Sequence, residues 1–278
     1  NAPEYAGSAQ LLGQERRGDV NEYARGDVGA HVSGSTTVSP VVNVLPRGRQ
    51  VVSVRASDAG FACVIDDLGN AGCFGEPESG RLGDEVEPTT KDGWRRVPLR
   101  SLPGSTDVDG NVVPAPPDLV IDLCVGKAHA CAISSVNDKA QLHCWGSNEV
   151  GQLGYNSSVS TIGQEQYPAS FPPVDLPTGL SARQVVCGDD HTCVLLDNKL
   201  EVICWGRNDV GQLGFVSSEN VVYNATDAQT LALGNQNDLV LSLTAGRQHT
   251  CAHFTLGGLR CWGNGLFGRL GTGSSTNV

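Results

Sequence analysis

Ten cysteines and six histidines are the residues of this sequence best suited to chemistry. Cysteine and histidine together form zinc sites, and a cysteine activated by a histidine can act as a nucleophile. His129, His191 and His249 each lie two residues before a cysteine. A zinc site needs four ligands that converge on one point, and a catalytic triad needs one uniquely placed histidine, whereas these histidines recur once per repeat and no C-x-x-C motif occurs. The sequence therefore predicts no catalytic residue, no metal site and no cofactor, and these histidines are expected to form hydrogen bonds within the fold.

The remaining polar candidates point the same way. His31, His143 and His253 have no partner motif. The acidic pairs at residues 66–67 and 189–190 lack the alternating oxygen-ligand spacing of a calcium loop. They are expected to be turn and surface residues.

The cysteines belong to an element that occurs four times. The copies read CFGEPESGRLG from Cys73, CWGSNEVGQLG from Cys144, CWGRNDVGQLG from Cys204 and CWGNGLFGRLG from Cys261, and each ends in a G-x-L-G element at the same distance from its cysteine. A second shared element with its own cysteine precedes each copy, at Cys63, Cys131, Cys193 and Cys251. Gly, Asn and Asp residues separate the two elements, and these are turn formers. Each repeat therefore contains a β-hairpin with a cysteine on each arm.

Spacing predicts how the cysteines pair. Residues at equal distances from a hairpin turn face each other across the antiparallel ladder, at a separation that a disulfide tolerates. The four expected hairpin disulfides are Cys63–Cys73, Cys131–Cys144, Cys193–Cys204 and Cys251–Cys261.

Cys124 and Cys187 remain. When Gly126 is aligned with Gly188, Cys124 lies two residues before its glycine and Cys187 one residue before, so the two side chains point to opposite faces of equivalent strands. Opposite faces of neighbouring units are the faces that meet. We expect a disulfide that joins the second unit to the third.

The elements that position these residues are short strands. Thirty-five glycines and 14 prolines indicate many turns, and β-branched runs after prolines supply further strands, so that each unit holds about four. We expect a single repeat domain over residues 1–278, with units at 14–83, 84–154, 155–214 and 215–271 and partial units at 1–13 and 272–278. Four-stranded units that cannot bury their own faces must stack, as in a propeller or a β-solenoid.

The combined pattern G-x-x-H-[TA]-C-[AV], a hairpin, then C-W-G-x-N-x-x-G-Q-L-G resembles the repeat of the regulator of chromosome condensation family of β-propellers, over nearly the whole chain. The cysteines on the hairpin are similar to those of a secreted, disulfide-rich branch. The resemblance implies an all-β propeller, of seven blades in most of the family, whereas this sequence offers about four four-stranded blades in longer cycles. The ring is therefore expected to close alone, to be part of a larger ring, or to be completed by another molecule.

The composition and charge of the chain disfavour some classes of partner. A net charge of −11 disfavours nucleic acid, since nucleic-acid binding draws its affinity from clustered Lys and Arg. No apolar run is long enough for a transmembrane helix, so membrane insertion is not expected, and a chain that begins at Asn1 without any methionine suggests a processed protein or an excerpt. The disulfides and the N-glycosylation triplets at Asn156 and Asn224 predict an extracellular or cell-surface glycoprotein.

The tryptophans of the repeat and a few residues outside it are further candidates for a functional role. The C-W-G tryptophans, at Trp145, Trp205 and Trp262, could form a ligand-binding ladder but are expected to pack between sheets. Two RGD triplets, Arg17-Gly18-Asp19 and Arg25-Gly26-Asp27, suggest adhesion or, more simply, charged loops, and Trp94 is a candidate surface contact.

The sequence thus predicts a non-catalytic extracellular scaffold or interaction propeller that contacts a protein partner or assembles with itself into a surface layer or filament. The alternative is a secreted inhibitor or ligand-binding propeller for a soluble protein, by resemblance to a propeller of this family that inhibits β-lactamases. The family's nuclear role in nucleotide exchange fits the disulfide spacing poorly.

Overall fold

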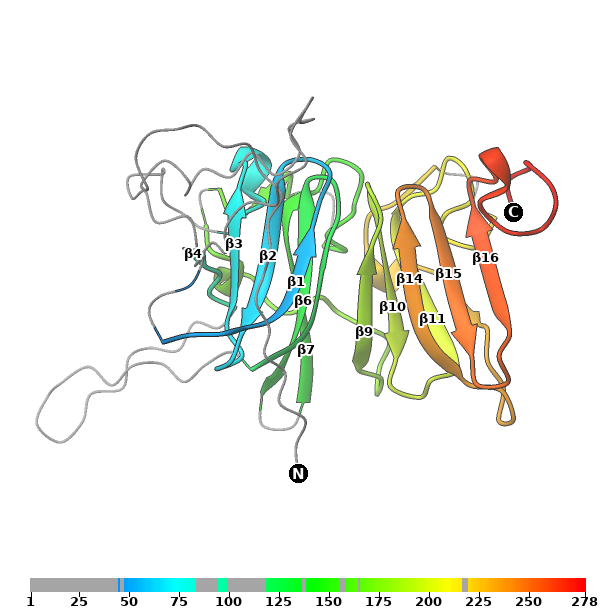
Figure 1. Cartoon of the computed structure of the whole chain (residues 1–278), viewed down its shortest axis with the longest axis horizontal. Coiled ribbons are helices and arrows are strands. Elements are labelled where there is room, and N and C mark those ends of the chain that lie inside the picture. Colours follow the sequence, from blue (N-terminus) through cyan, green and yellow to red (C-terminus); the bar gives the residue numbers. More distant parts are fainter. Residues whose placement is uncertain are drawn as a thin grey trace, which may run out of the picture.

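A computed structural model describes residue 45 and residues 48–83, 95–99, 119–136, 139–155, 159–164, 166–216 and 220–278. The elements are β1 Val51–Ala56, β2 Phe61–Asp66, β3 Ala71–Gly75, η2 Glu78–Gly80, β4 Arg95–Arg96, β5 Val120–Val125, β6 His129–Val136, β7 Lys139–Ser147, β8 Thr161–Ile162, η3 Pro168–Ser170, β9 Ala182–Cys187, β10 His191–Leu196, β11 Glu201–Arg207, β12 Val221–Val222, η4 Ala225–Asp227, β13 Thr230–Ala232, β14 Val240–Gly246, β15 His249–Phe254, β16 Leu259–Gly263 and η5 Leu266–Gly268 (Figure 1). Among these residues, no helix is long and apolar enough to cross a membrane.

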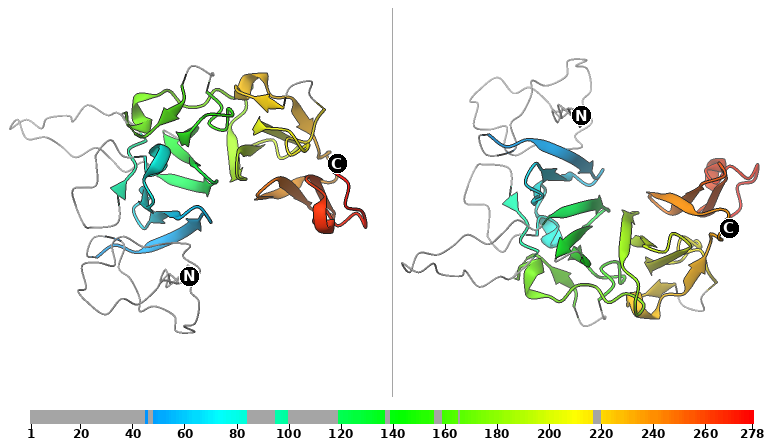
Figure 2. Two further views of the ribbon diagram at one scale, coloured as in Figure 1. Left: turned by 90° about the horizontal axis from the view of Figure 1, so that it is seen from above. Right: turned by 90° about the horizontal axis from the view of Figure 1, so that it is seen from below.

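The strands form four antiparallel sheets, here called blades 1 to 4. Blade 1 contains β1–β4, blade 2 β5–β8, blade 3 β9–β13 and blade 4 β14–β16. Within each blade the strands follow in sequence order, so the chain meanders outward from an inner strand, β1, β5, β9 or β14. The four blades follow one another around a common axis (Figure 2), and the predicted all-β propeller of four blades is confirmed.

Blades 1 to 3 each take their outer strand from the next sequence unit, whereas blade 4 has three strands. In blade 2, β8 follows the G-x-L-G element that ends at Gly154 and pairs with β7. In blade 3, the outer strand is interrupted, and β12 and β13 pair with the two ends of β11. A sequence unit that begins after G-x-L-G therefore contributes strands to two blades. Its first strand pairs with the preceding blade as the outer strand, and the chain then continues into the next blade.

The register places the hairpin cysteines opposite one another. Cys131 pairs with Cys144 across β6 and β7, and Cys193 pairs with Cys204 across β10 and β11. Their Cα atoms lie 4.0 and 4.1 Å apart. The disulfides join the pairs expected from the sequence, Cys63–Cys73, Cys124–Cys187, Cys131–Cys144, Cys193–Cys204 and Cys251–Cys261.

The core lies between blades. We call the face that a blade turns to its predecessor its leading face, and the opposite face its trailing face. Alternation along β10 sends Val194 and Leu196 into the cluster with blade 2, and sends Cys193 and Leu195 into the cluster with blade 4. A blade thus buries both faces, which explains why β10 is buried at every position.

The G-x-L-G element brings the backbone of one blade against the next. Gly154 has φ +75°, and a Cβ atom added there would lie 2.8 Å from the indole of Trp205 in blade 3. Gly83 and Gly214 meet the indoles of Trp145 and Trp262 in the same way. Glycine is therefore needed both for the left-handed backbone and for the close approach.

Candidate interaction site

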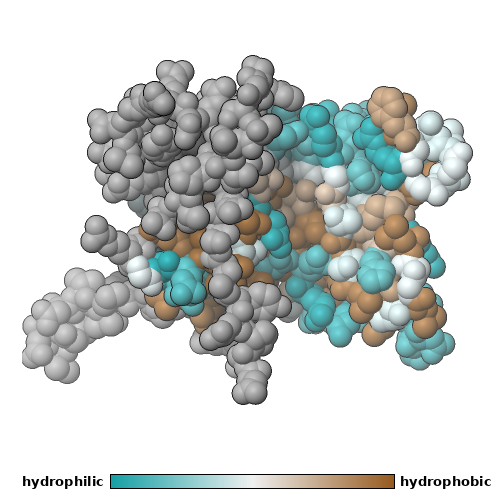
Figure 3. Space-filling view, viewed as in Figure 1, coloured by the Kyte–Doolittle hydropathy of each residue, from teal (hydrophilic) through white to brown (hydrophobic). Residues whose placement is uncertain are grey.

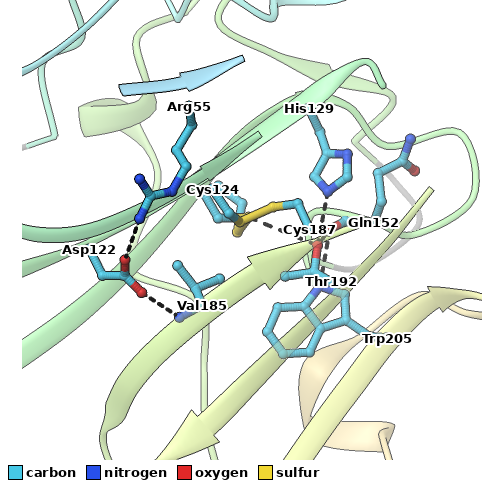
Figure 4. Close-up of a disulfide and its surroundings, with 11 residues drawn as sticks. Arg55, Asp122, Cys124, His129, Gln152, Val185, Cys187, Thr192 and Trp205 are labelled. Atoms are coloured by element: carbon cyan, nitrogen blue, oxygen red, sulfur yellow. Dashed lines mark hydrogen bonds and ion pairs between the residues drawn. A yellow bond between two sulfur atoms is a disulfide. The ribbon is translucent and has the colours of Figure 1, made fainter. Parts of the chain in front are cut away.

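The repeated histidine, threonine and tryptophan meet at the junction between blades 2 and 3 (Figure 4). His129 Nε2 lies 3.0 Å from Oγ1 of Thr192, and that hydroxyl donates to the carbonyl of Gln152 at 2.8 Å. Trp205 Nε1 donates to the same carbonyl at 3.1 Å. Because the threonine proton goes to Gln152, Nε2 of His129 carries the proton that it donates to Thr192. One carbonyl of the G-Q-L-G element therefore receives two side chains of the next blade.

The same network recurs between blades 3 and 4. His191 Nε2 lies 2.9 Å from Oγ1 of Thr250, and the carbonyl of Gln212 accepts from Thr250 at 3.3 Å and from Trp262 Nε1 at 3.0 Å. The repeated polar residues are thus connectors between blades. The tryptophans, fully or almost fully buried, pack between sheets as expected.

The junction between blades 1 and 2 has apolar residues in place of the histidine–threonine contact. Phe61 stands at the position of the histidine and Ala130 at that of the threonine, as the strand registers show. Trp145 Nε1 still donates to the carbonyl of Arg81 at 3.0 Å, and the Arg81 guanidinium lies over the Phe61 ring. The tryptophan contact is therefore common to the three junctions, and the histidine–threonine contact to two of them.

Burial fixes the histidines in their neutral form. Burial lowers the pKa of His129 to about 3 and that of His191 to about 4, with the next histidine along the axis adding to each shift. Their Nδ1 atoms are buried without a hydrogen-bond partner among the described residues. An imidazole in this state neither donates a proton to a substrate nor accepts one from it near pH 7, and it acts here as a structural donor.

A disulfide reinforces the junction of blades 2 and 3. Cys124 on β5 is joined to Cys187 on β9 (Figure 4). Cys131 lies opposite Cys124 on β6, and the three sulfur atoms of Cys124, Cys131 and Cys187 lie within 4.8 Å of one another. All three belong to disulfides, so none offers the thiolate that a metal ion requires.

Side chains of the inner strands form hydrogen bonds with the backbone of the next blade. Asp122 Oδ2 accepts from the Val185 N–H at 2.9 Å (Figure 4). Gln184 bonds both the N–H and the carbonyl of Leu243, at 2.7 and 3.0 Å. Sequence reasoning did not find these residues or the threonines, and their only signal was a polar residue at an equivalent place before the repeat cysteine.

Ion pairs of Arg247, in a turn of blade 4, reach turns of blades 3 and 1, and a further ion pair lies within blade 3. Asp189 accepts from Arg247 at 3.0 Å, and Arg247 reaches Asp58 of blade 1 at 3.8 Å. Asp190 pairs with Arg207 at 3.2 Å. Each of the two carboxylates of residues 189–190 is paired with its own arginine, in the turn after β14 or at the end of β11, and the two do not form a paired-carboxylate centre.

The trailing face of blade 4 differs from those of blades 2 and 3 because no described blade covers it. Figure 1 shows this face turned to the viewer with blade 3 behind it, and Figure 2 shows that blade 1 does not lie against it. Leu195 and Val202 of blade 3 are completely buried, whereas His253 and Leu259, at the same positions of blade 4, are exposed, Leu259 by 66%. In Figure 3 hydrophobic and hydrophilic residues lie side by side on it.

The edge of this face carries an exposed apolar turn. Leu266 and Phe267 are 52% and 92% exposed. Phe267 has φ +61°, a left-handed conformation that a bulky side chain rarely adopts. Glu149 and Val150 take these places in blade 2, and Asp209 and Val210 in blade 3. The same backbone conformation occurs at the equivalent Ser79 of blade 1, with φ +59°, so only the exposed apolar side chains are particular to blade 4, and they make this turn the candidate contact site.

The other sequence candidates fall partly outside the described residues. Asn224 caps η4, and its side-chain oxygen accepts from the Thr226 N–H within the same triplet. The residues that lie outside the description are Asn156, Trp94, His31 and both RGD triplets, Arg17-Gly18-Asp19 and Arg25-Gly26-Asp27.

Known proteins share this repeat and this fold. Two models of the regulator of chromosome condensation (RCC1) repeat match residues 139–195 and 182–212. The ultraviolet-B receptor UVR8 of Arabidopsis thaliana is 29% identical over 57% of this chain and 32% of its own length. The human probable E3 ubiquitin-protein ligase HERC4 is 31% identical over 57% of this chain and 14% of its own length. The chain thus spans about a third or less of these relatives.

Solved structures agree on the fold. Prp20p of Saccharomyces cerevisiae, studied for its binding to Gsp1p and histones, superposes with a TM-score of 0.61 at 18% identity, over 86% of this chain and 51% of that one. Human WBSCR16 gives a TM-score of 0.56 at 17% identity, over 92% of this chain and 73% of that one. The RCC1 repeat is thus matched over residues 139–212, and these solved structures share the β-propeller fold with this chain.

Proposed function

We propose that this RCC1-type β-propeller is a non-catalytic module that binds a protein partner outside the cell. The proposal rests on the observation that the repeated residues and the exposed apolar residues have different places in the structure. The repeated histidines of blades 2 and 3, together with the tryptophans and the cysteines, serve the blade junctions, whereas exposed apolar side chains gather on the last blade, at Leu259, Leu266 and Phe267. A propeller of this family, Prp20p, is described as binding Gsp1p and histones, so protein binding is a role that the fold supports elsewhere.

The extracellular part of the proposal rests on the cysteines. All ten are in disulfides, and one of these joins two blades. Disulfides of this number persist in oxidising compartments and are rare in the cytosol. N-linked glycan at Asn224 is compatible with this location, because the residue lies in a partly exposed turn.

A heterologous partner fits the exposed face better than a second copy of the chain. In a head-to-tail assembly, the leading face of blade 1 would have to cover the trailing face of blade 4. That leading face is already covered, since Ala62, Val64 and Phe74 are buried and Leu45 packs against them. We therefore propose a protein partner and not a filament.

The test compares matched variants as baits. The wild-type protein and Leu266→Asn/Phe267→Ser are immobilised and exposed to extracellular material from the source, with Val52→Ser as a control at another exposed apolar site. We expect a partner that the wild type and the control retain, that the turn variant loses, and that binds saturably once purified. Equal retention by all three proteins, or a purified partner that does not bind, would refute the proposal. A non-reducing peptide map of the secreted protein checks the compartment, and free thiols at these cysteines would contradict it.

A further inference from the structure

Blade 2 carries three cysteines in one row across its strands. Cys124 on β5 lies directly opposite Cys131 on β6, and Cys131 lies directly opposite Cys144 on β7. Residues that face each other across antiparallel strands point to the same side of the sheet. Cys131 therefore has a cysteine on either side, and each stands at a cross-strand separation that a disulfide tolerates.

The other hairpin disulfides have no third cysteine in their row. The place of Cys124 is taken by Arg55 in blade 1, by Val186 in blade 3 and by Thr244 in blade 4. None of these three side chains can take part in disulfide exchange. The row of three is thus particular to blade 2, and the repeat does not require it.

Blade 3 brings a fourth cysteine to this row. Cys187 is joined to Cys124 (Figure 4), and the sulfur atoms of Cys124, Cys131 and Cys187 all lie within 4.8 Å of one another. A disulfide exchanges when a thiolate reaches one of its sulfur atoms. A thiolate formed at Cys124 would therefore meet the Cys131–Cys144 disulfide with no change in strand register.

Burial decides where a thiol from outside can act. Cys131 and Cys144 are completely buried, Cys124 is 6% exposed, and Cys187 is partly exposed. An external thiol thus reaches the disulfide between the blades first at Cys187, and attack there makes Cys124 the leaving sulfur. The sulfur that is released is the one that stands beside Cys131.

We propose that these four cysteines form a thiol–disulfide exchange site for a low-molecular-weight thiol such as glutathione. The exchange moves Cys124 from Cys187 to Cys131, and it releases the covalent tie between blades 2 and 3. This proposal goes beyond the proposed function and does not depend on it, because it needs no protein partner.

The atoms and electrons of the exchange balance. The thiolate of glutathione attacks the sulfur of Cys187, a mixed disulfide forms there, and Cys124 leaves as a thiolate. Cys124 then attacks Cys131, the Cys131–Cys144 bond breaks, and Cys144 leaves and takes up the proton that glutathione gave to the solvent. Two disulfides and one thiol are present before and after, so the exchange consumes no oxidant or reductant.

The exchange changes one junction of the propeller. Among the five disulfides, Cys124–Cys187 joins two blades, whereas the other four each lie within a hairpin. After the exchange, the polar contacts between blades 2 and 3 remain, among them those of His129 with Thr192 and of Asp122 with the Val185 N–H. The blades stay packed, and their junction opens more readily.

The first test needs no added thiol. Cys187→Ser leaves Cys124 as a free thiol beside the Cys131–Cys144 disulfide, so that exchange within blade 2 can reach equilibrium. The folded protein is quenched with acid, which protonates thiolates and stops the exchange, and is then denatured, alkylated and digested with trypsin. Cleavage after residues 127 and 139 places Cys124, Cys131 and Cys144 in three different peptides.

We expect peptides that are linked through Cys124 and Cys131, with Cys144 alkylated, in at least about a tenth of the Cys187→Ser molecules. The Cys193–Cys204 disulfide has no third cysteine in its row and should stay intact in the same digest. If Cys187→Ser does not fold, the second test decides by itself.

The second test treats the folded wild-type protein with glutathione. We expect the adduct on Cys187, the link between Cys124 and Cys131 and the alkylated Cys144 to rise together. The control variant Cys131→Ala/Cys144→Ala removes the acceptor, so Cys124 can only attack the mixed disulfide and expel glutathione, and the adduct on Cys187 should fall at least about fivefold.

The Cys251–Cys261 disulfide is the internal control. Cys251 is 9% exposed and Cys261 is partly exposed, and Thr244 stands at the third place of their row. Glutathione that adds there should free the other cysteine of the same disulfide and create no new link.

Three results would overturn the proposal. The first is free Cys124 with an intact Cys131–Cys144 disulfide in every molecule, in either test. The second is a Cys124–Cys187 disulfide that stays intact at every glutathione concentration at which the protein remains folded. The third is a set of linked peptides that includes Cys193 or Cys204 in new pairs, because it would show scrambling of an unfolded chain.

Discussion

Substitution of Thr192 by valine tests whether the histidine–threonine contact stabilises the propeller. Thr192 is completely buried, and its hydroxyl joins His129 to the carbonyl of Gln152. Valine keeps the shape and removes the hydroxyl. The carbonyl of Gln152 retains Trp205, whereas Nε2 of His129 loses its partner.

The expected cost follows from these contacts. A buried donor left without a partner costs about 1–3 kcal/mol, and loss of the threonine–carbonyl bond adds about 1 kcal/mol. Thr192→Val should therefore lower the free energy of unfolding by about 2–4 kcal/mol. Thr192→Ser keeps the hydroxyl and removes one methyl group, so it should cost only about 1 kcal/mol.

Urea unfolding followed by tryptophan fluorescence and by circular dichroism measures both variants. Thr250→Val is the matched comparison at the last junction, where the hydroxyl lies 3.3 Å from its carbonyl against 2.8 Å at Thr192, and it should cost less than Thr192→Val. If Thr192→Val were as stable as Thr192→Ser, the hydrogen-bond network would not be what holds these blades together.

Four further predictions use other parts of the structure. His143→Ile should leave stability unchanged or raise it by about 1–2 kcal/mol in urea unfolding, because both ring nitrogens are buried without a partner among the described residues and isoleucine stands at that place in blade 3; a clear loss would refute this. Burial lowers the folded-state pKa of His129 to about 3 and that of His191 to about 4, so on acidification the unfolded chain binds protons before the folded one. The free energy of unfolding should therefore be at its full value above pH about 6.5 and fall by about 1.4 kcal/mol per pH unit per histidine as the pH drops toward about 4. A free energy of unfolding that does not change over this range would contradict the prediction. Gly154→Ala should cost at least about 2 kcal/mol, from its positive φ and its clash with Trp205, whereas Gly271→Ala, with positive φ alone, should cost about 1 kcal/mol; equal thermal shifts would argue against the packing. Replacing Cys124 and Cys187 by alanine should cost about 4 kcal/mol, and replacing Cys251 and Cys261 about 3 kcal/mol, because the first pair closes the longer loop; the reverse order in guanidinium unfolding would refute the loop argument.

Local features of the fold could be predicted from the sequence. A hairpin is fixed by its turn residues and the alternation of its strands, so Cys193 and Cys204 had to face each other. The same alternation put His191 and Cys193 on one face and Trp205 on the other. Even the contact between Cys124 and Cys187 followed from strand parity, because neighbouring units of a repeat meet by opposite faces.

The candidate site was less accessible to sequence reasoning. The repeat gave reason to set aside catalysis by His129, His191 and His249, and it directed attention to residues that it leaves unmatched. Several of those, such as Trp94 and the RGD triplets, lie outside the described residues. The turn at Leu266 and Phe267 departs in sequence from its counterparts in blades 2 and 3, but sequence reasoning did not single it out, because only the structure shows that these side chains are exposed.

The sequence by itself determined the repeat, the hairpins, the disulfide pairs and the absence of a unique histidine, because these depend on spacing within one unit or on parity between two. Only the tertiary structure decided that the His129 ring meets Thr192 and that Gln152 contributes its carbonyl and not its side chain. Such contacts join atoms about one blade apart in the chain, and their partners are set by how blades stack around the axis. For the same reason, only the tertiary structure separated His249, whose ring no described residue bonds, from His191, whose ring meets Thr250.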